Sequence, residues 1–208
     1  MAELKNGSLV VLEGLDGSGK SSISRKLIEF LSSSGIECVL TREPTERFRR
    51  SPEMENRRDW LTSMRMFFEF TIDRMQHVED IQKWLNDGQI VICDRFLYSS
   101  YAYQGPGIAE KFGSLSGAIQ WMRSVSHLIR VKPDLVIYLD VDPETAMKRI
   151  SRRTDIPSGF EELEFLGKVR EAYGIIQETT ENVVDANLPM DETLKEVIEI
   201  LRSKIRPL

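Results

Sequence analysis

The feature that most constrains this chain is a glycine-rich octapeptide between an apolar run and an amphipathic segment. Residues 14–21 read Gly-Leu-Asp-Gly-Ser-Gly-Lys-Ser and fit the pattern G-x-x-x-x-G-K-[ST]. The run Leu9–Leu12 before it is typical of a buried strand, and apolar residues recur at helical spacing after Lys20. A strand, a tight loop and a helix in this order predict the phosphate-binding loop of an α/β domain.

Each residue type in this loop has a chemical reason to be there. The glycines let backbone N–H groups converge on phosphate oxygens, and the start of the helix adds partial positive charge. Lys20 is expected to reach the β- and γ-phosphates of a nucleoside triphosphate, and the Ser21 hydroxyl is expected to ligate Mg²⁺. The expected cofactor site comprises Gly14, Leu15, Asp16, Gly17, Ser18, Gly19, Lys20 and Ser21.

Five short apolar runs predict the strands of the domain. They are nearly continuous in Val, Ile and Leu, which is typical of strands covered on both faces. Helical stretches separate them, so the alternation predicts a mostly parallel five-stranded sheet with helices on both faces. The strands are expected at Leu9–Leu12, Glu37–Leu40, Ile90–Cys93, Leu135–Leu139 and Val183–Val184, and the helices at about 21–34, 60–85, 115–130, 143–153, 160–180 and 190–205.

Length and composition limit the classes of protein further. The 208 residues carry no repeat, linker or low-complexity tract, so one domain over 1–208 is expected, with a small lid at about 149–162 beside Pro157 and Gly159. With 28 basic and 33 acidic residues, the net charge of −5 argues against a nucleic-acid-binding surface. No apolar run approaches the roughly 20 residues of a membrane span, and the first residues do not resemble a signal peptide. We therefore expect a cytoplasmic protein without a nucleic-acid or membrane partner.

A phosphate-binding loop serves several classes of protein, and three of them can be compared with this sequence. A GTPase would read guanine with N-K-x-D, and no Asn-Lys pair occurs in the chain. A mechanical ATPase usually ends a second strand in adjacent acidic residues, whereas Leu139-Asp140-Val141 carries one. A small-molecule kinase needs a second anion site, and Arg42 and Arg95 stand where two predicted parallel strands end, at the ligand-binding edge of such sheets.

Three further segments make the kinase hypothesis specific. Thr41-Arg42-Glu43-Pro44 ends the second strand, Phe70-x-x-Asp73-Arg74-x-Gln76-His77 lies on the long helix, and Asp94-Arg95-x-x-x-Ser99-x-x-Ala102-Tyr103-Gln104-Gly105 follows the third strand. Together with Glu13-Gly14 and Val184-Asp185-Ala186, they resemble the thymidylate kinase family in order and spacing over nearly the whole chain. The resemblance implies a P-loop kinase fold, transfer of the ATP γ-phosphoryl group to dTMP without a covalent intermediate, and a homodimer.

The pair Phe70 and Arg74 supports this resemblance by its own chemistry. Residues four apart share one helix face, where an aromatic ring can stack on a base beside a guanidinium group. Because Arg only donates hydrogen bonds, it favours the carbonyl at position 4 of thymine over the amino group of cytosine. An isolated pair of this kind is more often a core Phe with a solvated Arg, so the neighbouring motifs decide for base recognition.

Other roles follow from the resemblance alone. Arg42 is expected to hold the dTMP phosphate, while Asp94 and Arg95 organise the reacting phosphates and, indirectly through Asp94, the Mg²⁺. Tyr103 is expected to favour deoxyribose, Gln104 to contact the base edge or sugar, and Asp16 to lie near the sugar and the metal. The expected substrate site comprises Asp16, Arg42, Phe70, Arg74, Arg95, Ser99, Tyr103 and Gln104.

Two features of the sequence leave questions open. The phosphate-binding loop carries Gly17-Ser18 where some family members have an arginine, which implies that lid arginines, Arg149 and Arg153, face the γ-phosphate and join the catalytic set. After Pro44 the frequent Gly-Gly pair is replaced by residues 45–51, whose arginines either contact phosphate or belong to a solvated loop. A kinase of broad deoxynucleotide range and a nucleotide-binding regulator without catalysis are the alternative functions.

Overall fold

All five predicted apolar runs form strands of one sheet. The computed structural model describes residues 7–48, 59–154, 160–177 and 182–205. In that part of the chain the strand order is β2-β3-β1-β4-β5, and every neighbouring pair is parallel. The strands are β1 (Ser8–Gly14), β2 (Cys38–Arg42), β3 (Ile90–Asp94), β4 (Leu135–Asp140) and β5 (Val183–Asp185).

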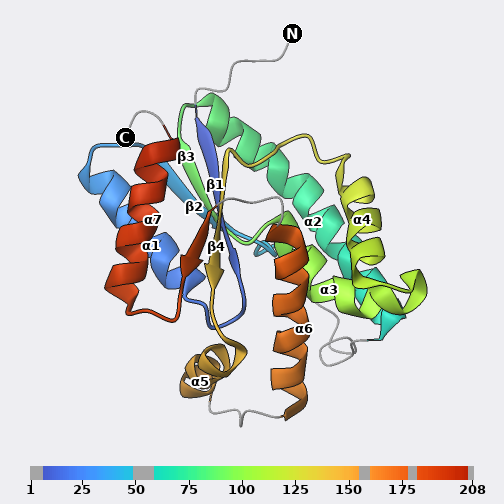
Figure 1. Ribbon diagram of the computed structural model, residues 1–208. Coiled ribbons are helices and arrows are strands. Elements are labelled where there is room, and N and C mark those ends of the chain that lie inside the picture. Colours follow the sequence, from blue (N-terminus) through green and yellow to red (C-terminus); the bar gives the residue numbers. More distant parts are fainter. Residues whose placement is uncertain (1–6, 49–58, 155–159, 178–181, 206–208) are drawn as a thin grey trace.

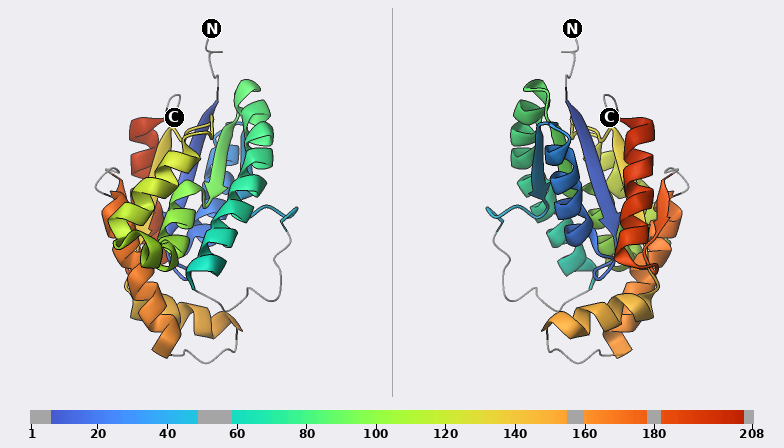
Figure 2. Two further views of the ribbon diagram at one scale, coloured as in Figure 1. Left: turned by 90° about the vertical axis from the view of Figure 1, so that its right-hand side faces the viewer. Right: turned by 90° about the vertical axis from the view of Figure 1, so that its left-hand side faces the viewer.

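Helices cover both faces of this sheet, as Figures 1 and 2 show. α1 (Lys20–Ser33) and α7 (Met190–Lys204) pack on one face, while α2 (Trp60–Asn86) and α3 (Leu97–Phe112) pack on the other. α4 (Leu115–Ser126) and α6 (Phe160–Gln177) lie against α3, and α5 (Pro143–Thr154) lies beyond the carboxyl ends of the strands. The predicted α/β class, with a P-loop kinase fold, is confirmed.

The alternation of side chains along β1 explains why its apolar run is continuous. Val10 and Leu12 pack with residues of α1 in one buried cluster, and Leu9 and Val11 pack with residues of α2 in another. Because successive strand residues point to opposite faces, a strand between two helical layers needs an apolar residue at every position. The sheet is therefore a rigid support for the residues at its edge.

The carboxyl ends of the parallel strands bring the candidate polar residues to one edge. The phosphate-binding loop leaves β1 there, Arg42 ends β2, and Asp94 ends β3 directly opposite Arg42 in the strand register. The loop that follows β4 reaches α5 at the same edge. Every strand before β5 thus delivers at least one chemical group to this edge, as expected for an open α/β sheet.

One helix was not predicted, and two expected boundaries differ from the structure. α3 contains Gly105-Pro106-Gly107, three residues that oppose helix formation locally, yet it runs unbroken through them. Packing against α4 favours the helix despite these residues. Gly105 permits the close approach of the two helices, because a Cβ at this position would lie 3.3 Å from the side chain of Leu115. α4 ends at Ser126 rather than near residue 130. α5 continues to Thr154, inside the expected lid, and residues 155–159 of that lid lie outside the described residues.

None of the described helices is both long enough and apolar enough to span a bilayer.

Candidate active site

The glycines of the phosphate-binding loop permit a close approach between the loop and α5. Gly17 has a φ of +84°, and a Cβ at this position would lie 2.4 Å from the carbonyl oxygen of Ala146. Gly19, with a φ of +96°, immediately precedes the first residue of α1. The loop consequently turns tightly into the helix start, the geometry that directs backbone N–H groups toward an anion.

Lys20 lies inside this loop and bonds to its backbone. Its Nζ donates to the carbonyl oxygens of Gly14 and Leu15 at 3.0 and 2.7 Å. Burial, followed by the nearby charge of Arg95, lowers the pKa of the Lys20 ammonium group to about 7. An anion in the loop would oppose both effects, because negative charge stabilises the protonated amine.

Ser21 and Asp94 meet at the start of α1. The Ser21 hydroxyl donates to Asp94 Oδ2 at 2.6 Å, while Asp94 Oδ1 is buried and has no hydrogen-bond partner among the described residues. The described residues contain no group of three or more His, Cys, Asp or Glu side chains that could enclose a metal ion. This donor set fits Mg²⁺, which usually keeps several water ligands and binds through few protein oxygens together with phosphates.

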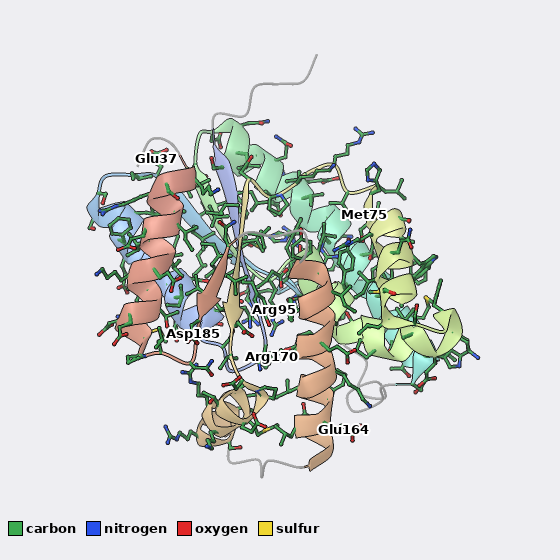
Figure 3. The ribbon with its side chains drawn as sticks, in the orientation of Figure 1. Glu37, Met75, Arg95, Glu164, Arg170 and Asp185 are labelled. Carbon is green, nitrogen blue, oxygen red and sulfur yellow. The ribbon has the colours of Figure 1, made fainter. Side chains whose placement is uncertain are left out.

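Arg95 adopts a backbone conformation that is rare for a non-glycine residue. Its φ is +76°, in the left-handed region, and its N–H donates to the carbonyl oxygen of Leu12 at 3.0 Å. The guanidinium group donates to Ser99 Oγ at 2.9 Å and to Asp16 Oδ1 at 2.7 Å. Such strain persists only where the surroundings enforce it, and here it directs a cation toward the loop (Figure 3).

Asp16, Arg95 and Tyr103 form a triangle of contacts at the mouth of the loop. The Tyr103 hydroxyl donates to Asp16 Oδ2 at 3.0 Å and accepts from the Asp16 N–H at 2.7 Å. The Arg95 guanidinium group lowers the pKa of Asp16 to about 2, and burial raises the pKa of Tyr103. Asp16 is therefore a carboxylate, and Tyr103 a neutral phenol, throughout the physiological range.

A cavity of about 280 Å³ opens beside this triangle. Its wall includes Arg42 from β2, Phe70 and Arg74 from α2, and Gln104 from α3. The side chain of Arg42 is exposed, and its guanidinium group forms no hydrogen bond or ion pair with the described residues. The structure thus brings the whole expected substrate set to one cavity, namely Asp16, Arg42, Phe70, Arg74, Arg95, Ser99, Tyr103 and Gln104.

Arg74 lines this cavity and has one donor nitrogen without a partner among the described residues. It is 1% exposed, its Nε donates to Glu43 Oε2 at 2.6 Å, and its Nη2 donates to Ser100 Oγ at 2.9 Å. Its Nη1 is buried without a partner among the described residues, and so is Gln104 Oε1 on the facing helix. An unpaired buried donor and acceptor are costly, so a partner that satisfied these two atoms would be favourable.

Several residues that position the site were not among the expected site residues. Glu13 accepts hydrogen bonds from the N–H of Phe96, from Ser99 Oγ and from the Tyr173 hydroxyl, and so fixes the turn that carries Arg95. The sequence offers no signal for Tyr173, which comes from α6, 160 positions from Glu13.

A second supporting network holds Arg74. Glu43 Oε1 lies 3.0 Å from His77 Nδ1, and His77 Nε2 lies 2.6 Å from Thr41 Oγ1. The carboxylate of Glu43 therefore connects β2 to two residues of α2, one of which is Arg74. Glu43 and His77 stand in the quoted motifs, so the motif spacing was the available signal.

The described part of the segment after Pro44 contacts α2, while Glu46 and Arg47 remain exposed. Thr45 donates from its backbone N–H and its hydroxyl to Asp73, at 2.8 and 2.6 Å. Arg47 pairs with Asp80 at 2.8 Å, so it is engaged with a carboxylate. The Phe48 ring packs on Phe70 with 5.0 Å between centroids. Arg49, Arg50 and Ser51 lie outside the described residues.

Of the expected lid cations, Arg149 lies at the loop. Its Nη1 donates to the carbonyl oxygens of Gly17 and Ala186 at 3.3 and 2.8 Å, which joins α5 to the phosphate-binding loop and to the segment after β5. The side chain of Arg153 lies outside the described residues. Arg170 on α6 clamps Asp140 and Asp142 after β4, at 2.9 and 2.8 Å (Figure 3).

Comparison with known proteins agrees with this geometry. The profile of the family described as Thymidylate kinase matches residues 12–197. The chain belongs to the thymidylate kinase family. The chain is 39% identical to the probable thymidylate kinase of Thermoplasma acidophilum, over 95% of this chain and 97% of that protein. It is 32% identical to the thymidylate kinase of Brachyspira hyodysenteriae, over 97% of both chains. The resemblance drawn from the motifs is confirmed, and the chain is a thymidylate kinase family enzyme.

Proposed function

We propose that this chain transfers the γ-phosphoryl group of ATP to dTMP, giving dTDP and ADP, and that the 280 Å³ cavity holds dTMP. The observation that carries the proposal is that Arg74 and Gln104 line this cavity together with Phe70, and that each has one buried atom, Nη1 and Oε1, without a partner among the described residues. Thymine offers a carbonyl at position 4 and an N–H at position 3. The unpartnered donor of Arg74 and the unpartnered acceptor of Gln104 would complement these two groups.

Cytosine would mismatch both atoms. Its amino group at position 4 would face the Arg74 donor, and its unprotonated N3 would face the Gln104 oxygen. Each unpaired buried polar group costs on the order of 1–3 kcal/mol, so two mismatches predict strong discrimination. The alternative of a broad deoxynucleotide kinase is therefore disfavoured.

The cations at the edge of the sheet account for phosphoryl transfer without a covalent intermediate. Arg42 would hold the dTMP phosphate, and Arg95, which lines the same cavity and bonds to Asp16 of the phosphate-binding loop, would act between that phosphate and ATP. A phosphate oxygen is already a nucleophile, so the enzyme acts mainly by positioning and by neutralising charge that develops in the transition state. Lys20, Arg95 and the lid arginines Arg149 and Arg153 supply this positive charge.

Mg²⁺ is the metal that the site suits. Ser21 would bind it directly, and Asp94 would bind it through water, using the oxygen that has no partner among the described residues. When bound, the ion would reduce the negative charge of the ATP phosphates. Ser21 and Asp94 already lie 2.6 Å apart, so their positions need little adjustment.

We also propose that residues 1–208 act as one cytoplasmic domain whose lid, at about 149–162, excludes water during transfer. Water in the open site would hydrolyse ATP to ADP and phosphate without forming dTDP. The hydrogen bond from Arg149 to the carbonyl oxygen of Gly17, at the start of this segment, supports the proposal.

The outer face of α2 supports a homodimer. Four large apolar side chains, spaced along one face of the helix, are 43–59% exposed, namely Leu61, Phe68, Ile72 and Met75. Apolar stripes of this kind are typical of surfaces that pair. Sedimentation equilibrium should therefore give a dimer mass, and Ile72→Glu should shift the protein toward monomer. A wild-type monomer at micromolar concentration would contradict this part of the proposal.

A direct experiment measures ADP release with Mg²⁺-ATP and dTMP, dUMP, dCMP, dGMP, UMP or thymidine. The proposal predicts turnover with dTMP well above dCMP, dGMP and UMP, and none with thymidine, which lacks the accepting phosphate. Similar rates for all bases would retain a kinase and overturn the assignment of the cavity. No turnover with any of them would leave a nucleotide-binding protein without catalysis.

A further inference from the structure

The hydroxyl of Tyr173 contacts a hydrogen-bond partner of each of the two buried cations at the site. On one side it lies 3.3 Å from the carbonyl oxygen of Gly14, which also accepts from Lys20 Nζ at 3.0 Å. On the other side it lies 3.0 Å from Ser99 Oγ, which accepts from Arg95 Nη1 at 2.9 Å. One oxygen atom of α6 therefore connects the phosphate-binding loop to the guanidinium group of Arg95.

Packing fixes the position of this hydroxyl. Tyr173 is 1% exposed, and its helix, α6, packs along α3 (Figure 1). The ring lies on that of Tyr138 in β4, with 4.7 Å between centroids. Three residues earlier on α6, Arg170 pairs with Asp140 at the end of β4 at 2.9 Å. The ring contact and the ion pair hold α6 against the sheet, so the hydroxyl is a fixed point for the groups around it.

The direction of the hydrogen bonds follows from the chemistry of the partners. Ser99 Oγ donates its proton to Glu13 Oε2 at 2.5 Å, and the Tyr173 hydroxyl lies 3.0 Å from the same carboxylate oxygen. The carbonyl oxygen of Gly14 and the carboxylate of Glu13 only accept hydrogen bonds, so the phenol is the donor to both. Burial raises the pKa of Tyr173 well above its usual range, so this donor is present throughout the physiological range.

We infer that Tyr173 is a positioning residue for phosphoryl transfer, whose hydroxyl fixes the phosphate-binding loop and Arg95 relative to each other. The inference rests on the proposed function, in which the loop holds ATP and Arg95 acts between ATP and the dTMP phosphate. Alignment of the two phosphates matters because a misplacement of about 1 Å costs about a hundredfold in rate. Tyr173 does not line the dTMP cavity, so its hydroxyl would act on the transfer rate rather than on dTMP binding.

Tyr173→Phe is the direct test, because it removes the hydroxyl and keeps the ring on Tyr138. We expect the single-turnover rate of transfer from Mg²⁺-ATP to dTMP, measured by rapid quench, to fall about ten- to a hundredfold. The Kd values of dTMP and Mg²⁺-ADP should change less than about threefold, since an interaction that serves alignment in the transition state affects the rate and not ground-state binding.

Tyr138→Phe is the matched control. Tyr138 is 2% exposed, and its hydroxyl donates to Asp140 Oδ1 at 3.3 Å, which bonds to neither Lys20 nor Arg95. Each variant loses one buried hydroxyl from the same ring pair, so a merely structural role predicts the same small effect on transfer in both. We expect only Tyr173→Phe to lower the transfer rate. Equal rates in the two variants, or a loss in Tyr173→Phe that is found in the Kd of dTMP instead of the rate, would overturn the inference.

Ser99→Ala breaks the same connection from α3, so it tests the inference independently and also where Tyr173→Phe does not fold. We expect it to lower the transfer rate as well. Because both variants interrupt one connection, the double variant should be no slower than the slower single variant. Losses that multiply in the double variant would show that the two side chains act separately, and would overturn the inference.

The wild-type protein distinguishes failure of this role from failure of the proposed function. A wild type that transfers no phosphoryl group to dTMP would contradict the proposed function, and with it the role of Tyr173. A wild type that is active with dTMP, together with a Tyr173→Phe variant of the same transfer rate, would overturn the role of Tyr173 alone.

Discussion

The phosphate-binding loop and the dTMP cavity are built in opposite ways. The loop is eight consecutive residues between one strand and one helix, and its shape depends on local glycine conformations. The cavity takes its wall from β2, α2, α3 and the loop itself, and its key cation depends on Glu43 and Ser100. We therefore expect changes in the loop to affect the reaction with little loss of stability, and changes around the cavity to affect stability and specificity together.

Arg95 belongs to both regions, so its removal should have the largest effect. Arg95→Ala is expected to lower kcat by about 10³-fold or more, since arginines at transferring phosphates contribute on that scale. The fold should be retained, because Ala removes the side-chain contacts of Arg95 without creating a cavity in the hydrophobic core. Steady-state kinetics and circular dichroism check both points, and a kcat close to that of the wild type would exclude this role.

Glu43→Gln tests the dependence of the cavity on its buried ion pair. Glu43 and Arg74 are 4% and 1% exposed, so the neutral variant leaves a buried, uncompensated guanidinium group. Breaking such a pair costs about 3–5 kcal/mol. Urea unfolding should show this loss for Glu43→Gln and little loss for the loop variant Lys20→Met. Equal stabilities of the two variants would remove the contrast between the regions.

The protonation state of Lys20 gives a test of the phosphate-binding loop. With a pKa of about 7, Lys20 in the free protein is mostly neutral at pH 8. Phosphates stabilise its charged form, so Mg²⁺-ADP binding should take up close to one proton at pH 8 and progressively less as the pH falls below 7. Calorimetry in two buffers of different ionisation enthalpy measures this uptake, which Lys20→Met should abolish. Binding without net proton uptake at pH 8 would show that Lys20 is already charged.

The smallest expected effect concerns the segment that replaces the usual Gly-Gly pair. Phe48 packs on Phe70, the ring proposed to stack on thymine. An aromatic pair is worth about 0.5–1.5 kcal/mol, so Phe48→Ala should raise the KM for dTMP about three- to tenfold with kcat unchanged. Arg47→Gln, which removes an exposed ion pair nearby, is the matched control and should change KM less than twofold. Equal effects of the two variants would show that the Phe48 ring has no specific role.

The same contrast explains what the sequence could predict. The loop, the five strands and the arginines at their ends follow from local patterns, and all of them lie where expected. α3 could not be predicted, because Gly105-Pro106-Gly107 opposes a helix and tertiary packing against α2, α4 and α6 compensates. The link from Tyr173 to Glu13 joins residues 160 positions apart, and no local pattern records it. Arg74 was predicted as a base contact, but its dependence on Glu43 required the fold.

The central claim is that two buried atoms, Arg74 Nη1 and Gln104 Oε1, recognise thymine. The most direct test is the ratio of kcat/KM for dTMP to that for dCMP in the wild type and in Gln104→Leu, which removes the acceptor without touching the Arg74 ion pair. The account predicts a wild-type ratio of at least about a hundredfold and a fall of about tenfold or more in the variant. A wild-type ratio near one, or an unchanged ratio in Gln104→Leu, would contradict it.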